Sequence, residues 1–177
     1  MEQLTDILTD ATARIEGLYM RLPVDGGEGQ YRERVYCYEL YHQMRSLWPD
    51  PCDYSLNGEV DKRGHPIIAA LTAAMAIPDL LVHTPGSMQG NHAILEVKHA
   101  NASRDGIRKD LRTLSRFRQN DIHYERAIYL FFGGVRMDRL TEVVGETEFA
   151  KLPPIEVWVH EQAGAPACRV TTFERPV

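Results

Sequence analysis

Apolar residues recur along the chain with two different spacings, and the first of them predicts helices. Between about residues 3 and 20, and again between about 31 and 48, apolar residues return every three or four positions, which is the spacing of one helix face. A glycine-rich turn at 26–29 separates the two stretches, and Pro49 and Pro51 follow the second. We therefore expect two helices before the first strand.

Shorter apolar runs further along the chain are typical of buried strands. Two of them, Ile77–His83 and Ala93–Lys98, are rich in branched residues and are separated by turn-forming residues. The Ala-rich stretch 65–76 fits either a strand or a helix. The other elements that the pattern predicts are strands at about 54–60, 127–132, 155–160 and 170–173, and helices at about 103–120 and 137–151.

The order of these elements predicts an α/β fold. Helix, strand, strand, strand, helix and strand follow one another over about residues 31–134, which favours a central mixed sheet with helices on both faces. The segments before and after this core add an N-terminal helix and a C-terminal helix and strand. A length of 177 residues suits one domain, residues 1–177, with a sizeable core.

Ionisable residues interrupt the two central strands, where a buried strand normally carries none. Asp79 lies at the start of the first run, and Glu96 and Lys98 lie in the second. Because Glu96 and Lys98 are two positions apart, they project from the same face of their strand. Two carboxylates and an ammonium on one buried face are costly unless a cation or a reaction requires them. The chemistry that they suit is metal-assisted hydrolysis of a phosphodiester.

The motifs Pro78-Asp79 and Glu96-Val97-Lys98 resemble those of the PD-(D/E)XK nuclease superfamily, also called restriction-endonuclease-like. Their separation (96 − 79 = 17) is what two adjacent antiparallel strands and a loop require. The resemblance implies a core in αβββαβ order and a Mg²⁺-dependent endonuclease, with Mn²⁺ as an alternative ion and DNA favoured over RNA. It further implies that Asp79, Glu96 and the Val97 carbonyl bind the metal. Lys98 would then orient or deprotonate the attacking water.

The helix before the strands supplies a further carboxylate. Glu33 falls within the apolar stripe of that helix. The related nucleases often carry a Glu here, commonly followed by Arg, as in Glu33-Arg34, so we expect Glu33 to join the catalytic group and hold a second ion or a water. Two alternatives stay open: Glu33 only favours the helix dipole, or Glu39, just outside the stripe, is the true member of the site. Arg34 and Tyr38 lie on the opposite face, where we expect them to be solvated.

A basic stripe runs along the helix after the strands. Arg108, Arg112 and Arg116 recur every four residues, with Lys109 close by. Such a stripe can bind successive phosphates of nucleic acid, and we expect it to flank a groove leading to the catalytic lysine. The alternative is an ordinary solvated face, partly balanced by acidic residues such as Asp110.

Composition indicates the compartment of the protein more clearly than the reaction that it carries out. A net charge of −5 counts against a protein that coats nucleic acid, although it permits positive charge gathered at one groove. Cys37, Cys52 and Cys168 show no paired spacing and are expected to be free thiols in a reducing cytosol. No apolar run approaches the roughly 20 residues of a membrane span, and the acidic N-terminus is unlike a secretory signal. We expect a cytoplasmic protein, and the sequence leaves open whether it forms a homodimer.

Two competing interpretations remain at this level. One is a non-catalytic module with a nuclease fold that binds nucleic acid or a protein partner. The other is an ordinary α/β protein in which Glu96 and Lys98 form an ion pair on a strand surface. His83 and His99 are expected to be structural in each case. Only the nuclease requires a divalent site where the two central strands meet, so metal titration separates the three.

Overall fold

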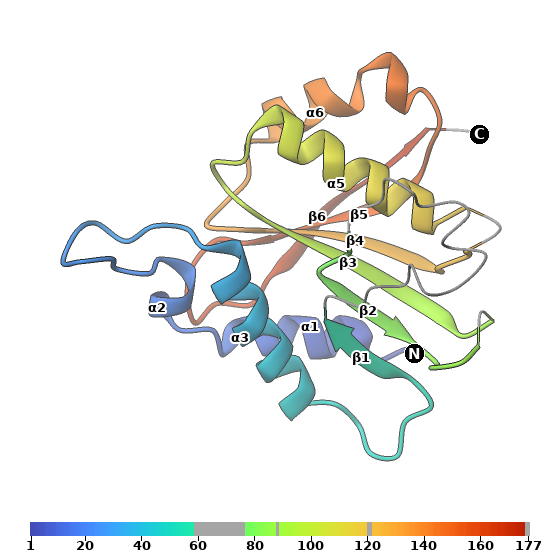
Figure 1. Cartoon of the computed structure of the whole chain (residues 1–177), viewed down its shortest axis with the longest axis horizontal. Coiled ribbons are helices and arrows are strands. Elements are labelled where there is room, and N and C mark those ends of the chain that lie inside the picture. Colours follow the sequence, from blue (N-terminus) through green and yellow to red (C-terminus); the bar gives the residue numbers. More distant parts are fainter. Residues whose placement is uncertain (59–76, 88, 120–121, 176–177) are drawn as a thin grey trace.

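The computed structural model describes residues 1–58, 77–87, 89–119 and 122–175. Its centre is one open sheet of six strands with helices on both faces, so the predicted α/β class is confirmed (Figure 1). The stretch 65–76 lies outside the described residues. The strands are β1 (Ser55–Gly58), β2 (Leu80–His83), β3 (Asn91–His99), β4 (Arg126–Phe132), β5 (Leu152–His160) and β6 (Cys168–Arg175).

The helices fall before, between and after the strands of this sheet. From α3 to β4 the order of the described elements is α3, β1, β2, β3, α5, β4, which is the order that the apolar pattern predicts. None of the described helices is both long enough and apolar enough to cross a membrane. The helices are α1 (Leu4–Ala13), α2 (Gly17–Met20), α3 (Glu33–Ser46), α5 (Arg104–Phe117), α6 (Met137–Val144) and the 3₁₀ turn η2 (Thr147–Phe149).

The strands lie side by side in chain order and form a mixed sheet. β1, β2 and β3 are antiparallel neighbours, whereas β4 is parallel to both β3 and β5. The edge strand β6 returns antiparallel to β5. The two parallel links need crossover connections, and α5 and α6 provide them.

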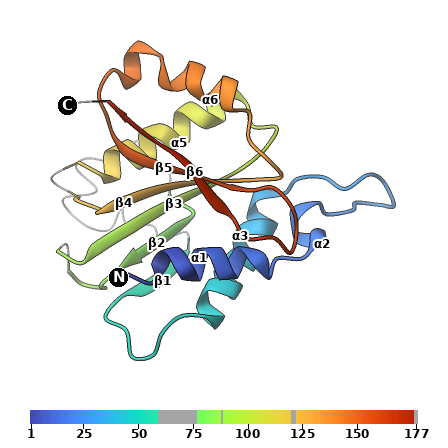
Figure 2. The same ribbon diagram turned by 180° about the vertical axis from the view of Figure 1, so that it is seen from behind.

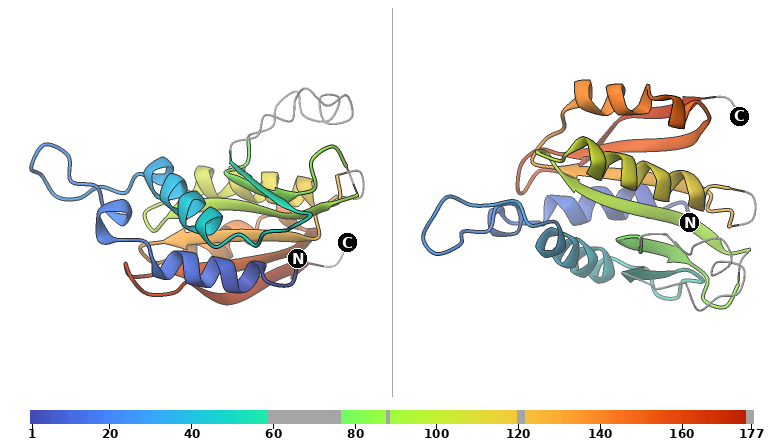
Figure 3. Two further views of the ribbon diagram at one scale, coloured as in Figure 1. Left: turned by 90° about the horizontal axis from the view of Figure 1, so that it is seen from below. Right: turned by 45° about the horizontal axis from the view of Figure 1, so that its top comes forward.

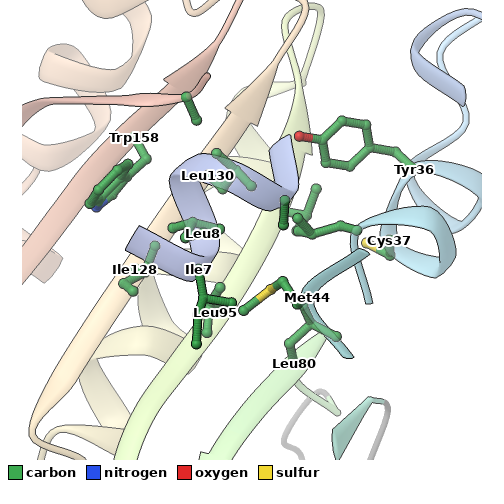
Figure 4. Close-up of a cluster of buried hydrophobic side chains, with 14 of the residues drawn as sticks. Ile7, Leu8, Tyr36, Cys37, Met44, Leu80, Leu95, Ile128, Leu130 and Trp158 are labelled. Carbon is green, nitrogen blue, oxygen red and sulfur yellow. The ribbon is translucent and has the colours of Figure 1, made fainter. Parts of the chain in front are cut away.

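Helices cover the two faces of the sheet in two pairs. Figures 2 and 3 show α1 and α3 on one side and α5 and α6 on the other. The core under α1 and α3 includes Leu95 and Val97 of β3, whereas Ile94 belongs to the core under α5 and α6 (Figure 4). Because side chains alternate along a strand, Glu96 and Lys98 lie on the same face as Ile94, the face that α5 covers.

Two predicted helices are shorter in the structure than the apolar spacing suggests. The expected helix at 3–20 is divided into α1 and α2, because Glu16 is extended and leaves Leu18 exposed. The helix expected at 137–151 ends at Val144, before Gly145. Apolar spacing continues through both breaks because the chain beyond them still packs on the sheet; Phe149 of η2 is buried there.

Candidate functional site

The Asp79 and Glu96 carboxyl groups meet where β2 begins. The antiparallel register pairs Leu80 with Leu95, so the next residues outward, Asp79 and Glu96, are opposite each other. Glu96 is only 5% exposed, and Asp79 is partly buried. The two carboxyl groups lie close enough for each to shift the pKa of the other, and the backbone N–H of Val97 donates to Asp79 Oδ2 over 2.7 Å. The structure thus brings together the two carboxylates that the sequence singles out.

This carboxyl pair holds a proton more tightly than separate carboxyl groups would. Burial raises the pKa of Asp79 to about 6, against the opposing effect of the Val97 N–H. Burial and the nearby Asp79 charge raise the pKa of Glu96 well above its ordinary value. The buried Oε1 atom of Glu96 has no hydrogen-bond partner among the described residues. Without a cation, the pair therefore retains a proton near neutral pH.

Lys98 lies between two other carboxylates and not beside Glu96 alone. Its Nζ is 3.1 Å from Glu33 Oε2 and 3.0 Å from Asp110 Oδ2. Burial lowers the pKa of Lys98, but the charges of Asp110 and Glu33 outweigh that effect, and the pKa lies above its usual value. Lys98 is therefore an ammonium at neutral pH, which suits it to orienting water or offsetting negative charge and not to deprotonating water. With Glu96 buried and Lys98 engaged elsewhere, the interpretation as a strand-surface ion pair is wrong.

Of the two helix carboxylates considered from the sequence, Glu33 lies at this cluster and Glu39 does not. Glu33 begins α3, and besides Lys98 it approaches His99, with 3.7 Å between Oε1 and Nε2. Glu39 instead accepts a hydrogen bond from Gln43 at 2.6 Å. The helix-wheel argument therefore placed Glu33 correctly, whereas its role in holding an ion or a water stays a prediction.

Asp110 is the member of this cluster that the sequence analysis missed. Its side chain is 2% exposed, and besides Lys98 it accepts a hydrogen bond from the Tyr129 hydroxyl at 2.9 Å. In α5 it lies three residues after Ile107 and four before Leu114, so it belongs to the buried face and not to the solvated one. A single carboxylate within an apolar stripe is the signal that identified Glu33, and it would have found Asp110 as well.

The basic stripe of α5 contacts acidic residues beyond the helix. Arg108 Nε is 2.6 Å from Glu146 Oε2, and Arg112 binds both carboxylate oxygens of Glu148. These two arginines lie on the α6 side of α5, so the expectation that they flank a groove leading to Lys98 is wrong for them. Nucleic-acid binding by Arg108, Lys109, Arg112 and Arg116 stays a prediction.

A pocket opens beside Asp79, between α3 and the adjoining ends of β1 and β2. Its volume is about 680 Å³. Arg34 and Tyr38, which the sequence analysis assigned to solvent, form part of its wall, because the outer side of α3 faces the strand ends. The lining residues are Glu33, Arg34, Cys37, Tyr38, Tyr41, Asn57, Gly58, Asp79 and Leu80.

The carboxyl pair has the chemistry of a site for a hard divalent cation, although it consists of only two side chains in the described part of the chain. Among the described residues, no three or more His, Cys, Asp or Glu side chains form a metal-binding group. Asp79 and Glu96 nevertheless offer carboxylate oxygens, the ligands that Mg²⁺ prefers, from facing positions of adjacent strands, and burial is the main cause of their raised pKa values. The part assigned to the Val97 carbonyl stays a prediction. The residues present therefore fit such an ion, with water completing its shell.

Comparison with known proteins neither supports nor contradicts a function for this site. The chain matches no protein-family model, no curated protein and no solved structure.

Proposed function

We propose that the protein is a metal-dependent nuclease with a restriction-endonuclease-like core that hydrolyses phosphodiester bonds of DNA. The observation that carries the proposal is the pair formed by Asp79 and Glu96, two carboxyl groups at facing positions of adjacent strands, of which Glu96 is only 5% exposed. Lys98, two positions along β3, supplies a cation close to that pair. The element order from α3 to β4 and the resemblance of the two motifs support the same conclusion.

Asp79 and Glu96 would hold the ion. A bound Mg²⁺ polarises a phosphate and lowers the pKa of a bound water. The Val97 N–H fixes the orientation of the Asp79 carboxylate by donating to Oδ2. The ion would also displace the proton that the pair holds.

Lys98 would offset the charge that develops on the phosphate and orient the attacking water. Glu33 and Asp110 hold its ammonium from two sides, so the ammonium is positioned before substrate arrives. Because Glu33 already binds Lys98, we assign it the positioning of that ammonium, with a second ion as its further potential role.

A cleavage assay tests the proposal. Supercoiled, linear and single-stranded DNA are incubated with the protein and either Mg²⁺ or Mn²⁺. The parent should cleave, and Asp79→Asn and Glu96→Gln should each lower the rate by about 100-fold or more. Glu39→Gln is the matched control, since that carboxylate hydrogen-bonds Gln43 away from the pair, and it should cleave at the parent rate.

Two results would count against a nuclease. Cleavage that survives Glu96→Gln at the parent rate would show that the pair is not the site. A parent that cleaves no substrate with either ion would favour the non-catalytic module that binds nucleic acid or a protein partner.

A further inference from the structure

Two tyrosines form an aromatic wall of the pocket beside Asp79. Tyr38 and Tyr41 are three residues apart on α3, so they lie on the same side of the helix. The Tyr38 side chain is 60% exposed, which is unusual for a large aromatic residue at the edge of a pocket. Tyr41 lies against the end of β1, where its Cδ2 is 3.9 Å from the place that a Cβ on Gly58 would occupy. The absence of a side chain at Gly58 keeps this end of the pocket open.

The polar groups of the pocket are those that recognise a nucleotide. Asn57 Oδ1 is 2.9 Å from His83 Nε2, which fixes the amide and presents its NH₂ group as a donor. Arg34 lines the same pocket four residues before Tyr38, and a guanidinium suits either a phosphate or the face of a base. Aromatic faces beside amide and guanidinium donors are the combination that binds unpaired bases.

The size of the pocket restricts what can enter it. Its volume of about 680 Å³ is within the roughly 300–1,000 Å³ of sites that enclose a small ligand. Bases within a continuous duplex are stacked on their neighbours, so their faces cannot reach Tyr38 or Tyr41. An unpaired base can, because it has left the stack.

We propose that this pocket binds an unpaired nucleotide of single-stranded DNA, with the base against Tyr38 and Tyr41. The enzyme would then act on single strands, frayed ends or extruded bases in preference to continuous duplex. The substrate preference rests on the proposed nuclease function, whereas the binding of single strands by the pocket can be measured without cleavage.

The test measures binding where cleavage is blocked. Fluorescence anisotropy follows a labelled oligothymidylate of about eight nucleotides, within the range of single-strand sites, added to the Glu96→Gln protein. This background keeps position 96 uncharged, as it is in the protonated pair. The single strand should bind more tightly than a duplex of equal length. Adding Tyr38→Ala should weaken binding roughly 5- to 100-fold, the usual cost of losing one stacked base, whereas Tyr38→Phe should restore it.

Leu18→Ala is the matched surface control, because Leu18 is 52% exposed on α2 and does not line the pocket. It should bind like the background protein. Equal affinity for single strand and duplex, or a Tyr38→Ala protein that binds as tightly as Tyr38→Phe, would overturn the inference.

The outcome is separable from that of the nuclease proposal. A parent that cleaves duplex in the cleavage assay, while the Glu96→Gln protein does not bind the single strand, contradicts the pocket and leaves the nuclease. Binding that depends on Tyr38, in a protein whose parent cleaves nothing, supports the pocket and contradicts the nuclease.

Discussion

Two groups of charged side chains lie on opposite sides of α5, and they are organised differently. On the outer side, two arginines contact carboxylates in a solvent-exposed network, in which Arg108 binds Glu146 and Asp105 and Arg112 binds Glu148. On the inner side, four carboxyl groups of the described part of the chain surround the ammonium of Lys98. These four are Asp79, Glu96, Glu33 and Asp110.

The difference shows which of the two groups of charges can be accounted for by its effect on folding stability alone. Each outer pair is partly exposed, and exposed ion pairs contribute little to stability, so it needs no function to account for it. The inner group buries more negative than positive charge, and the raised pKa values of Asp79 and Glu96 show that the folded state is penalised for it. A bound cation is the simplest reason for keeping such a group.

The largest effect is expected when the one inner cation is removed. Lys98→Met leaves the buried Asp110 carboxylate without its ion-pair partner, and loss of one partner of a buried pair typically costs about 3–5 kcal/mol. Urea denaturation should show this loss, and adding Asp110→Asn should recover part of it. Lys109→Met, an exposed neighbour on α5, is the control. A loss below about 1 kcal/mol for Lys98→Met would mean that the inner group is solvated like the outer one.

Neutralising one carboxylate of the Asp79–Glu96 pair should raise the stability of the protein, by less than the loss of Lys98 lowers it. The pKa of Asp79 is about 6 in the folded protein, above the roughly 3.9 of an unfolded chain. The folded state therefore gains stability from the proton on Asp79 at low pH and loses that gain as the pH rises through about 6. In EDTA at pH 8, Asp79→Asn should be more stable than the parent by roughly 1–3 kcal/mol, and the difference should vanish near pH 4.

Asp138→Asn provides a control with the reverse dependence on pH. The hydrogen bond from Arg136 and other contacts lower the pKa of Asp138 to about 2, so its contribution to stability is present at neutral pH and is lost as the pH falls. Thermal melting from about pH 2 to 8 compares the two variants, because the Asp138 contribution is lost between about pH 4 and pH 2. A parent that is more stable than Asp79→Asn at pH 8 without metal would contradict the account of the inner group.

The smallest effect is expected on the outer side of α5. Arg112→Gln should lower stability only slightly, and the loss should shrink further in high salt because both partners are exposed. Thermal melting at low and high ionic strength checks both points. A larger loss that does not depend on salt would show that the outer ion pairs stabilise the fold. The two sides of α5 would then not differ in the way described.

The features that sequence predicted correctly depend on local spacing. The alternation of strand side chains places Glu96 and Lys98 on one face, and the 17-residue separation allows Asp79 to lie opposite Glu96. The position of Glu33 followed from the apolar stripe of its helix. The element order from α3 to β4 followed from the same rules, since each element bears its own apolar pattern.

The features that sequence did not predict depend on packing between distant segments. That Asp110 approaches Lys98 depends on how α5 lies across β3, which no local pattern specifies. Arg34 and Tyr38 belong to the outer side of α3 by periodicity, yet the ends of β1 and β2 bring that side into a pocket. Likewise, Arg108 and Arg112 form a basic stripe in sequence, but the acidic residues after α6 pair with them.

The most direct test of the central claim is a calorimetric titration with Mn²⁺ in two buffers of different protonation enthalpy. If Asp79 and Glu96 form a cation site, the parent should bind Mn²⁺ and release about one proton, because the ion replaces the proton that the pair holds. Glu96→Gln should lose most of that affinity, whereas Glu39→Gln should bind like the parent. Equal Mn²⁺ binding by both variants, or binding by the parent without proton release, would contradict the account.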